Sequence, residues 1–352
     1  MIKTAVVTKV GRLNDPDAGK RGVIEILDEP KMELRDEDVR IKVAYCAICG
    51  SDPHTAAGIF GWEAPFGMGH EMSGVITELG KNATKKGLKV GDRVGGNFLR
   101  FCGSCYYCKS GLEQFCPYGE DGNRPCFAEE VVWHESQVFK LPESVSLLQG
   151  CLMEPISVSV RTLDKAEVKL GHRVLISGGG PIGQIDLQLA RLSGAAVIAL
   201  SEPIAARREL ALKYGADYVI DPTTQDLKTE ADKITGGWGF DVVIDASGSK
   251  YAAAALPEVT AKGGRIVYAA QYPNDYEMPL NLFEYLYEHE LTLTGVYASP
   301  YVYPRTAEVM SKLDLADLTQ KIFPLDQIKE AFDCHLSGKY PKVIVKCNPD
   351  LE

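Results

Sequence analysis

Four cysteines lie close together in the pattern C-x2-C-x2-C-x7-C. Four thiolates on one short loop can complete a tetrahedral shell around zinc and leave no coordination position for a substrate. Two disulfides are the alternative, which is less favoured because clustered cysteines in a reducing compartment are more often metal ligands. The spacing therefore predicts a structural zinc site in a lobe at residues 100–118, held by Cys102, Cys105, Cys108 and Cys116.

A second set of metal-binding side chains is spread along the chain. Cys49 precedes GSD, His70 lies in GMGHE, and Glu154 lies in LMEP. A thiolate, an imidazole and a carboxylate from separate segments would supply three ligands and leave a fourth position open, as catalytic zinc requires. Taken singly, a buried cysteine is usually a core residue and a glutamate is usually a surface charge. Their combination with the four-cysteine lobe predicts a second, catalytic zinc ion.

A glycine-rich loop follows the apolar segment Val174–Ser177 and opens a helical stretch. In the pattern G-x-G-x-x-G, the glycines permit a tight turn, a close approach of the backbone to pyrophosphate, and close packing of helix on strand. The helix N-terminus then offers N–H groups to the phosphates. A strand–helix turn in an unrelated α/β protein is the alternative. The loop predicts a dinucleotide site formed by Gly178, Gly180, Pro181, Ile182 and Gly183.

The cofactor preference depends on the acidic residue that follows the second apolar segment, AVIALSE. Glu202 could accept hydrogen bonds from both adenosine ribose hydroxyls and would repel a 2′-phosphate. Arg207 and Arg208 follow closely, and they could instead hold a phosphate, stack on adenine or remain solvated. We assign Arg207 to the cofactor site and expect NAD in preference to NADP.

The elements that must position these residues fall into two groups. Residues before about 155 form short β-rich segments broken by Gly and Pro, which is typical of an irregular β domain. From Arg173 onward, short apolar strands alternate with helical stretches, which predicts a parallel sheet covered by helices on both faces. The alternation ends after Gly295. We expect an α/β protein in which residues 1–157 and 297–352 form one domain and residues 158–296 form the other.

The composition is that of a globular enzyme. The chain has 352 residues and a formal net charge of −10. An acidic surface disfavours nucleic-acid binding. No apolar stretch is long enough to span a bilayer, and the first residues do not resemble a signal peptide. We therefore expect a cytoplasmic protein with a small-molecule partner and neither membrane nor nucleic-acid contacts.

Together these motifs resemble those of the zinc-dependent medium-chain alcohol dehydrogenase superfamily. The resemblance is carried by CGSDPH, GHE, the four-cysteine lobe, VGDRV, GGGPIG, the acid after the second strand, and GKYPKVIV. It implies a GroES-like irregular β catalytic domain joined to a Rossmann domain, with the active site between them. It also implies a homodimer or homotetramer and hydride transfer between NAD(H) and an alcohol or ketone.

The resemblance also implies roles for residues around the catalytic metal. Cys49 and His70 match metal ligands, and Glu154 matches the third ligand of the sorbitol, butanediol and threonine dehydrogenase branch. Glu71 matches a glutamate that approaches the metal directly or through its water. Cys151 is a competing ligand of lower rank.

Further residues match groups that move protons, orient a ligand or bind the cofactor. Ser51 and His54 match a relay that carries the alcohol proton to solvent through a ribose hydroxyl. Asp52 matches the carboxylate that orients the His70 ring. Lys342, in GKYPKVIV, is assigned to cofactor binding.

The substrate is the least determined feature. Polyol dehydrogenases of this branch typically carry an Arg–Tyr pair where this chain has Ala298 and Ser299. Phe60, Trp62 and Phe66 offer apolar surface instead, unless they only pack under the GHE loop. These features favour a diol or an apolar secondary alcohol. A polyol or amino alcohol is the alternative substrate, and a non-catalytic, zinc-stabilised nucleotide-binding protein is the alternative class.

Overall fold

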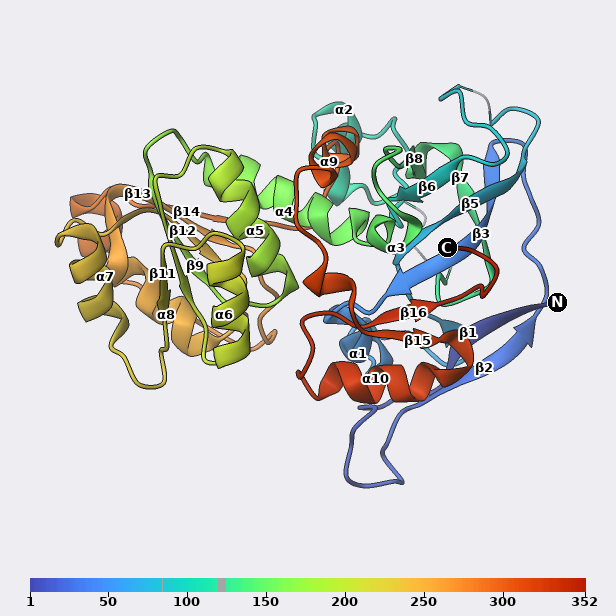
Figure 1. The fold of residues 1–352 in the computed structure, drawn as a ribbon, viewed down its shortest axis with the longest axis horizontal. Coiled ribbons are helices and arrows are strands. Elements are labelled where there is room, and N and C mark those ends of the chain that lie inside the picture. The colour runs from blue at the N-terminus through green and yellow to red at the C-terminus, as the bar shows by residue number, and fades with distance from the viewer. Residues whose placement is uncertain (84, 120–124) are drawn as a thin grey trace. The chain divides into compact units, whose positions relative to one another are not determined.

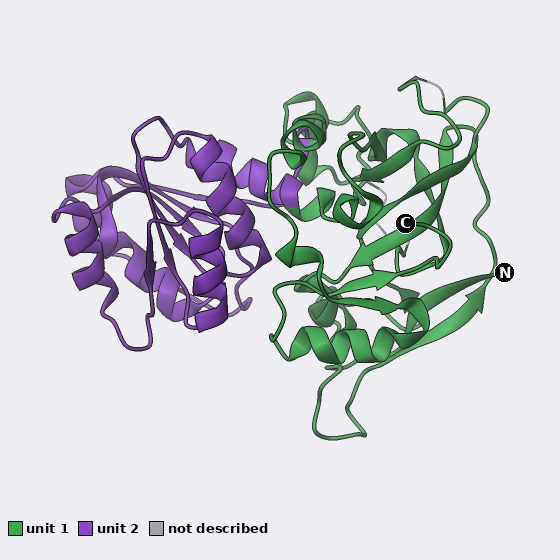
Figure 2. Cartoon of the chain, in the orientation of Figure 1, with its two compact units in different colours: residues 1–155, 303–352 green, residues 156–302 purple. Residues whose placement is uncertain are grey.

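The computed structural model describes residues 1–83, 85–119 and 125–352. The chain divides into two compact units, shown in different colours in Figure 2. Unit 1 comprises Met1–Pro155 together with Tyr303–Glu352, and unit 2 comprises Ile156–Val302. The chain therefore leaves unit 1, forms all of unit 2 and then returns to complete unit 1.

Unit 2 is built on a six-stranded sheet in which all neighbouring strands are parallel (Figure 1). The strand order is β11-β10-β9-β12-β13-β14, which is that of a doubly wound dinucleotide-binding domain. The α/β class predicted from the alternating pattern is confirmed. The strands are β9 (Arg173–Ser177), β10 (Val197–Ser201), β11 (Tyr218–Ile220), β12 (Phe240–Asp245), β13 (Thr260–Tyr268) and β14 (Thr292–Gly295).

The helices of unit 2 pack against this sheet, and local signals set their ends. Helix α7 begins after Asp226, whose side chain accepts a hydrogen bond from Thr229 N–H, and ends at the left-handed Gly236. The helices are α5 (Pro181–Leu192), α6 (Ala205–Lys213), α7 (Leu227–Thr235), α8 (Lys250–Val259) and the π-helix η3 (Phe283–Glu288). Helix α4 (Met153–Ala166) begins in unit 1 and continues into unit 2.

Unit 1 contains two sheets of mostly antiparallel strands. One is three-stranded, in the order β2-β1-β4, and the other has seven strands in the order β15-β16-β3-β5-β6-β8, with β7 paired to β3. The strands are β1 (Ile2–Lys9), β2 (Val23–Glu29), β3 (Asp38–Ala47), β4 (Phe66–Gly67), β5 (Glu71–Leu79), β6 (Arg93–Gly96), β7 (Glu130–His134), β8 (Val138–Lys140), β15 (Ile322–Pro324) and β16 (Ile344–Lys346).

Short helices connect these strands. They are α1 (Ser51–Ala56), α2 (Tyr106–Lys109), η1 (Glu113–Phe115), η2 (Glu135–Gln137), α3 (Leu147–Gly150), α9 (Tyr303–Met310), η4 (Asp317–Thr319), η5 (Leu325–Gln327) and α10 (Ile328–Leu336). The irregular β domain and its C-terminal return confirm the predicted GroES-like fold class.

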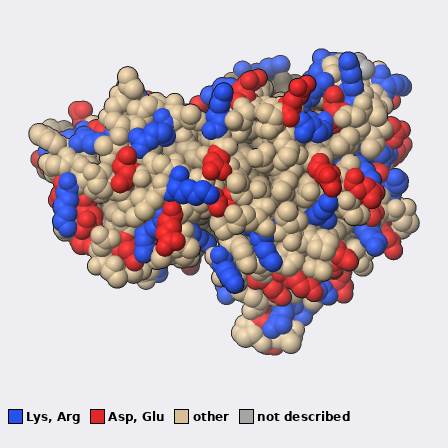
Figure 3. Space-filling view, in the orientation of Figure 1, with Lys and Arg blue, Asp and Glu red and all other residues tan. Residues whose placement is uncertain are grey.

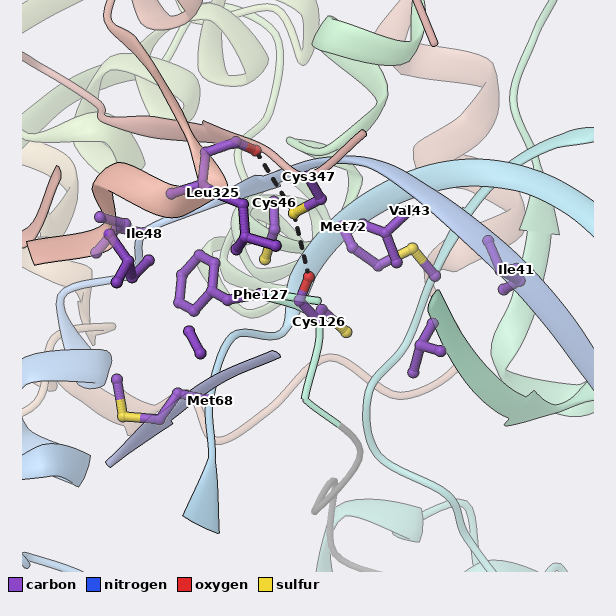
Figure 4. Packing of buried hydrophobic residues seen from close by; sticks show 14 of the residues in the cluster. Ile41, Val43, Cys46, Ile48, Met68, Met72, Cys126, Phe127, Leu325 and Cys347 are labelled. Atoms are coloured by element: carbon purple, nitrogen blue, oxygen red, sulfur yellow. Dashed lines mark hydrogen bonds between the residues drawn. The ribbon is translucent and has the colours of Figure 1, made fainter. Parts of the chain in front are cut away.

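The core of unit 1 joins the two ends of the chain. Figure 4 shows Leu325 and Cys347 packed with Cys46, Cys126 and Phe127, all of them buried. The Cys347 thiol donates a hydrogen bond to the carbonyl of Cys126 at 3.6 Å. Leu325 and Cys347, from the segment that returns to unit 1, are therefore part of the core around β3 and β5.

The surface carries both signs of charge. On the face shown in Figure 3, positive and negative side chains are interspersed, without an extended basic patch on the described residues. Within the described ranges, none of the helices combines the length and apolarity needed to cross a membrane.

Candidate functional site

Strand register brings the predicted ligands of unit 1 to one place. Ala47, the last residue of β3, pairs with Glu71 of β5 on one side and with Ile344 of β16 on the other. Cys49 follows the end of β3, and His70 immediately precedes β5. Three segments distant in sequence therefore meet where β3 ends.

The metal-binding atoms of Cys49, His70 and Glu71 all lie within 4.8 Å of one another. Glu71 is only 1% exposed, and both of its carboxylate oxygens face this group or the ammonium of Lys342. A thiolate, an imidazole and a carboxylate are ligands that zinc takes readily. The donor types and the short distances between them therefore fit a zinc ion.

Asp52 organises two of these ligands. Its Oδ2 accepts a hydrogen bond from the Cys49 backbone N–H at 2.8 Å, and its Oδ1 lies 3.4 Å from His70 Nδ1. Burial by itself would lower the pKa of His70, but the negative charges of Asp52 and Cys49 raise that pKa well above its usual value. Because Nδ1 faces Asp52, Nε2 is the ring nitrogen left for a metal, as predicted for an orienting carboxylate.

Glu154 and Cys151 do not belong to this group of three. Burial raises the pKa of Glu154 to about 7; the positive charge of His70 opposes this shift and the negative charge of Glu71 adds to it. The carboxyl is thus within electrostatic range of His70 and Glu71. The Cys151 thiol donates to the carbonyl of Leu148 at 3.1 Å, and burial raises its pKa. Glu71 lies with Cys49 and His70, while Glu154 as the third ligand remains a prediction.

Lys342 lies beside the metal ligands. Its ammonium donates a hydrogen bond to Glu71 Oε1 at 2.7 Å and lies 2.5 Å from Oε2. Lys342 is 5% exposed. Its predicted role in cofactor binding remains a prediction, whereas its pairing with Glu71 was not foreseen.

The proton-relay candidates lie on α1, directly after Cys49. The Ser51 backbone N–H donates to Cys49 Sγ at 3.5 Å, and His54 is exposed in the last turn of the helix. The side chains of Ser51 and His54 are therefore on the segment that carries a metal ligand. Their relay remains a prediction.

One aromatic ring contacts the group of three, and three others pack against one another. The Phe98 ring lies 4.8 Å from the His70 ring between centroids, a contact that the sequence motifs did not indicate. Trp62 packs at 5.8 Å from Phe60 and 5.5 Å from Phe66. Phe66 is buried in the core, so simple packing accounts for it, while Phe60 is 54% exposed.

The four-cysteine lobe forms a second candidate metal site. The thiols of Cys102, Cys105, Cys108 and Cys116 all lie within 4.8 Å of one another, and none is in a disulfide. Hydrogen bonds from the backbone and hydroxyl of Ser104 and from the backbone of Cys105 lower the pKa of Cys102 to about 6. A thiol that ionises readily is a good zinc ligand. The geometry fits the predicted structural zinc.

The glycine-rich loop of unit 2 has the geometry of a phosphate cradle. Gly178 has φ +101°, and a Cβ on Gly183 would lie 1.9 Å from the Gly178 carbonyl oxygen. Gly180 caps α5 without a side chain, and Pro181 and Ile182 form its first turn. The N–H groups of this turn are therefore free of a side-chain cap and can face a phosphate.

Glu202 lies beneath this loop. Its Oε2 accepts a hydrogen bond from Gly179 N–H at 2.7 Å, and its Oε1 accepts one from Ile204 N–H at 3.0 Å. Arg207 and Arg208 lie beside different carboxylates. Arg207 Nη1 lies 3.7 Å from Glu202, whereas Arg208 pairs with Asp221 at 2.9 Å. Arg208 is thereby engaged with a carboxylate.

Gln184 is a residue of this site that sequence reasoning missed. Its buried amide donates to the carbonyl of Gly179 at 3.1 Å and to that of Arg207 at 2.9 Å. It thus links the loop to the start of α6. Its position directly after the third glycine was the available signal.

Comparisons with known proteins agree with this architecture. Residues 35–143 match the alcohol dehydrogenase GroES-like domain, and residues 181–313 match the zinc-binding dehydrogenase domain. D-arabitol-phosphate dehydrogenase of Enterococcus avium is 34% identical, with 90% of this chain and 92% of that protein covered. L-threonine 3-dehydrogenase of Pyrococcus abyssi is 33% identical, with 87% and 90% covered.

A solved structure of a zinc-binding dehydrogenase from Clostridium scindens superposes with a TM-score of 0.91 at 32% identity, covering 98% of this chain and 99% of that one. The fold and the matched domains define an oxidoreductase of the alcohol dehydrogenase type. The chain belongs to the zinc-dependent medium-chain dehydrogenase superfamily, which confirms the predicted resemblance.

Proposed function

We propose that this protein is a zinc-dependent dehydrogenase that transfers a hydride between NAD(H) and a secondary alcohol or its ketone. The observation that carries the proposal is the close group of Cys49, His70 and Glu71, which offers three ligands of the kind that catalytic zinc takes. Zinc would lower the pKa of the alcohol oxygen, and NAD would accept the hydride. We further propose a cytoplasmic homodimer or homotetramer.

The residues of the chain have distinct parts in this proposal. Asp52 holds the Cys49 backbone and the His70 ring in place. Ser51 takes the alcohol proton and His54, exposed at the end of α1, passes it to solvent. In unit 2, Glu202 lies where it can exchange its backbone partners for ribose hydroxyls.

We propose an apolar secondary alcohol or a vicinal diol as substrate. Phe98 lies against His70, and Trp62 is only partly buried. The Ser299 hydroxyl is 2.7 Å from that of Ser157, so it is occupied within unit 2. A hexitol would bring hydroxyls that each cost about 1–3 kcal/mol if left without partners. The arabitol-phosphate and threonine dehydrogenases among the relatives make a polyol and an amino alcohol the alternatives.

The test is formation of NADH with 2,3-butanediol, a large apolar secondary alcohol, sorbitol and L-threonine, compared by kcat/KM. We expect one of the first two to be preferred, and a preference for sorbitol of about tenfold or more would contradict the substrate proposal.

Cys49→Ser should lower turnover by about two orders of magnitude or more, because it removes a metal ligand. Comparable turnover without metal would contradict the zinc-based function, as would NADH binding without any turnover.

A further inference from the structure

The sheet of unit 2 extends from β9 in two directions, with β10 and β11 on one side and β12, β13 and β14 on the other. Dinucleotides bind outside the carboxyl ends of the strands where the direction changes. The glycine-rich loop follows β9 and Glu202 follows β10, so the proposed function places the pyrophosphate and the adenosine ribose on the first side. The nicotinamide half of the cofactor then belongs to the ends of β12 and β13.

The loop after β12 is wedged between its two neighbours. A Cβ on Gly178, in the loop after β9, would lie 2.8 Å from Ser247 Cα. On the opposite side, a Cβ on Gly248 would lie 2.8 Å from the carbonyl oxygen of Gln271, in the segment after β13. Backbone therefore meets backbone on both sides, so these three segments can move little independently of one another.

Asp245, the last residue of β12, joins the loop after β12 to the segment after β13. It is fully buried. Its Oδ1 accepts hydrogen bonds from the Ser247 backbone N–H at 3.2 Å and from the Ser247 hydroxyl at 2.6 Å. Its Oδ2 accepts a hydrogen bond from the hydroxyl of Tyr272. Each of these donors helps to stabilise a carboxylate that burial would otherwise penalise.

Tyr272 is held by its neighbours as well as by Asp245. Its ring centroid lies 6.2 Å from that of Tyr268, on β13, and 5.9 Å from that of Tyr276. The Tyr276 hydroxyl in turn donates to the carbonyl of Lys250, the first residue of α8, at 2.9 Å. Burial and the negative charge of Asp245 raise the pKa of Tyr272 above its ordinary value, so the hydroxyl keeps the proton that it donates.

Resting on the proposed function, we propose that Tyr272 is a positioning residue for the nicotinamide half of the cofactor. Through Asp245 and Ser247, its hydroxyl keeps the loop after β12 in place against the glycine-rich loop, so that this side of the crevice is formed before the cofactor binds. Loss of the hydroxyl would break the link between the loop after β12 and the segment after β13. The adenosine side, formed by the ends of β9 and β10, does not use this link.

The test compares a ligand that occupies one half of the crevice with a ligand that occupies both. ADP carries the adenosine and both phosphates, and NADH adds the nicotinamide riboside. Calorimetric titration of the full-length protein with each ligand gives two dissociation constants. In Tyr272→Phe, we expect the NADH constant to rise by about tenfold, because a hydrogen bond to a charged group is lost, while the ADP constant stays within about twofold.

Tyr268→Phe is the matched control, because it removes a hydroxyl from the adjacent ring without removing a donor to Asp245. That hydroxyl contacts the Ala253 carbonyl at 3.4 Å and Met278 Sδ at 3.7 Å, so both constants should stay unchanged. Ser247→Ala removes a donor to Asp245 from the exposed loop and should give the same selective loss of NADH affinity. Thermal unfolding shows that each variant is folded, and Ser247→Ala carries the test if Tyr272→Phe is not.

The outcomes separate this proposal from the proposed function. If the parent protein binds NADH and Tyr272→Phe binds it equally well, the role of Tyr272 is wrong and the proposed function stands. The role is also wrong if ADP loses affinity to the same extent, or if Tyr268→Phe gives the same loss, since the effect would then belong to the whole of unit 2. A parent protein that binds no nicotinamide dinucleotide overturns both proposals.

Discussion

Asp186 is a carboxylic acid in the interior of unit 2, on α5. It is fully buried, with the Ser159 hydroxyl as its polar neighbour. Burial raises its pKa from 3.8 to about 8, a shift that the nearby Ser159 hydroxyl opposes. The folded protein therefore keeps a proton on Asp186 that the unfolded chain releases above pH 4.

This proton makes the stability of the protein depend on pH. Because the pKa is higher in the folded state, the free energy of unfolding should fall as pH rises from about 4 to about 8, by about 1.4 kcal/mol per unit. Asp186→Asn removes the titrating group and should flatten this decline, measured by chemical unfolding at pH 5, 6 and 7. The exposed Asp275→Asn is the control, and an equal flattening there would contradict the assignment to Asp186.

Glu202 is the residue on which the NAD preference depends. Its oxygens are held by the N–H groups of Gly179 and Ile204, which aim the carboxylate at the loop. Glu202→Ala should weaken NAD binding by about 1–3 kcal/mol, since hydrogen bonds to a charged group are lost. The same change should weaken NADP binding less. Fluorescence titration of the protein with NADH and with NADPH measures the two dissociation constants. An unchanged ratio of the two dissociation constants would identify another residue as the determinant.

At the scale of elements, the turn from β9 to α5 shows how closely packed a phosphate cradle is. The Gly178 carbonyl oxygen lies where a side chain on Gly183 would begin. Gln184, the next residue, ties the loop to the start of α6 through two carbonyl groups. The position of the first-turn N–H groups thus depends on the absence of a single Cβ atom.

Gly183→Ala should displace the turn because a Cβ cannot remain 1.9 Å from a carbonyl oxygen. We expect NADH affinity to fall by about tenfold or more, since the phosphates lose aligned donors. Metal content should stay the same, because the candidate ligands belong to unit 1. Gly295→Ala, at the end of β14, is the control, because a Cβ there would lie 3.9 Å from the nearest atom, the Tyr268 carbonyl oxygen. Equal losses in both variants would argue against the packing explanation.

At the scale of the whole molecule, two metal sites serve one unit in different ways. The lobe site has four thiols, which close a tetrahedral shell, while the site at the end of β3 has three mixed ligands. The lobe has short helices, α2 and η1, and many exposed side chains, so it has little core of its own. Its organisation should therefore depend on the metal.

We predict two zinc ions per chain, measured by elemental analysis of the purified protein. Cys105→Ser and Cys49→Ser should each remove one zinc, but with different consequences. Loss of the lobe zinc should raise protease sensitivity around residues 100–118, because metal binding supplies the folding energy of small metal lobes. Loss of the zinc at Cys49 should leave the lobe as resistant to protease as it is in the parent protein. A single zinc in the parent protein would contradict the prediction.

The sequence by itself determined the features that local spacing controls. The lobe cysteines lie within one short segment and the glycines within one turn, so their geometry follows from the backbone over a few residues. Strand and helix alternation predicted the α/β class for the same reason. Local pattern also missed α7, whose Asp226 cap was an available signal.

Only the tertiary structure decided which groups meet across the sheet. That Glu71 lies beside Cys49 and His70, and that Lys342 pairs with Glu71, follows from the register of β3 with β5 and β16. Likewise, the burial of Asp186 depends on what packs over α5. Register and burial arise from contacts between distant segments, and a linear pattern of residue types does not encode those distances.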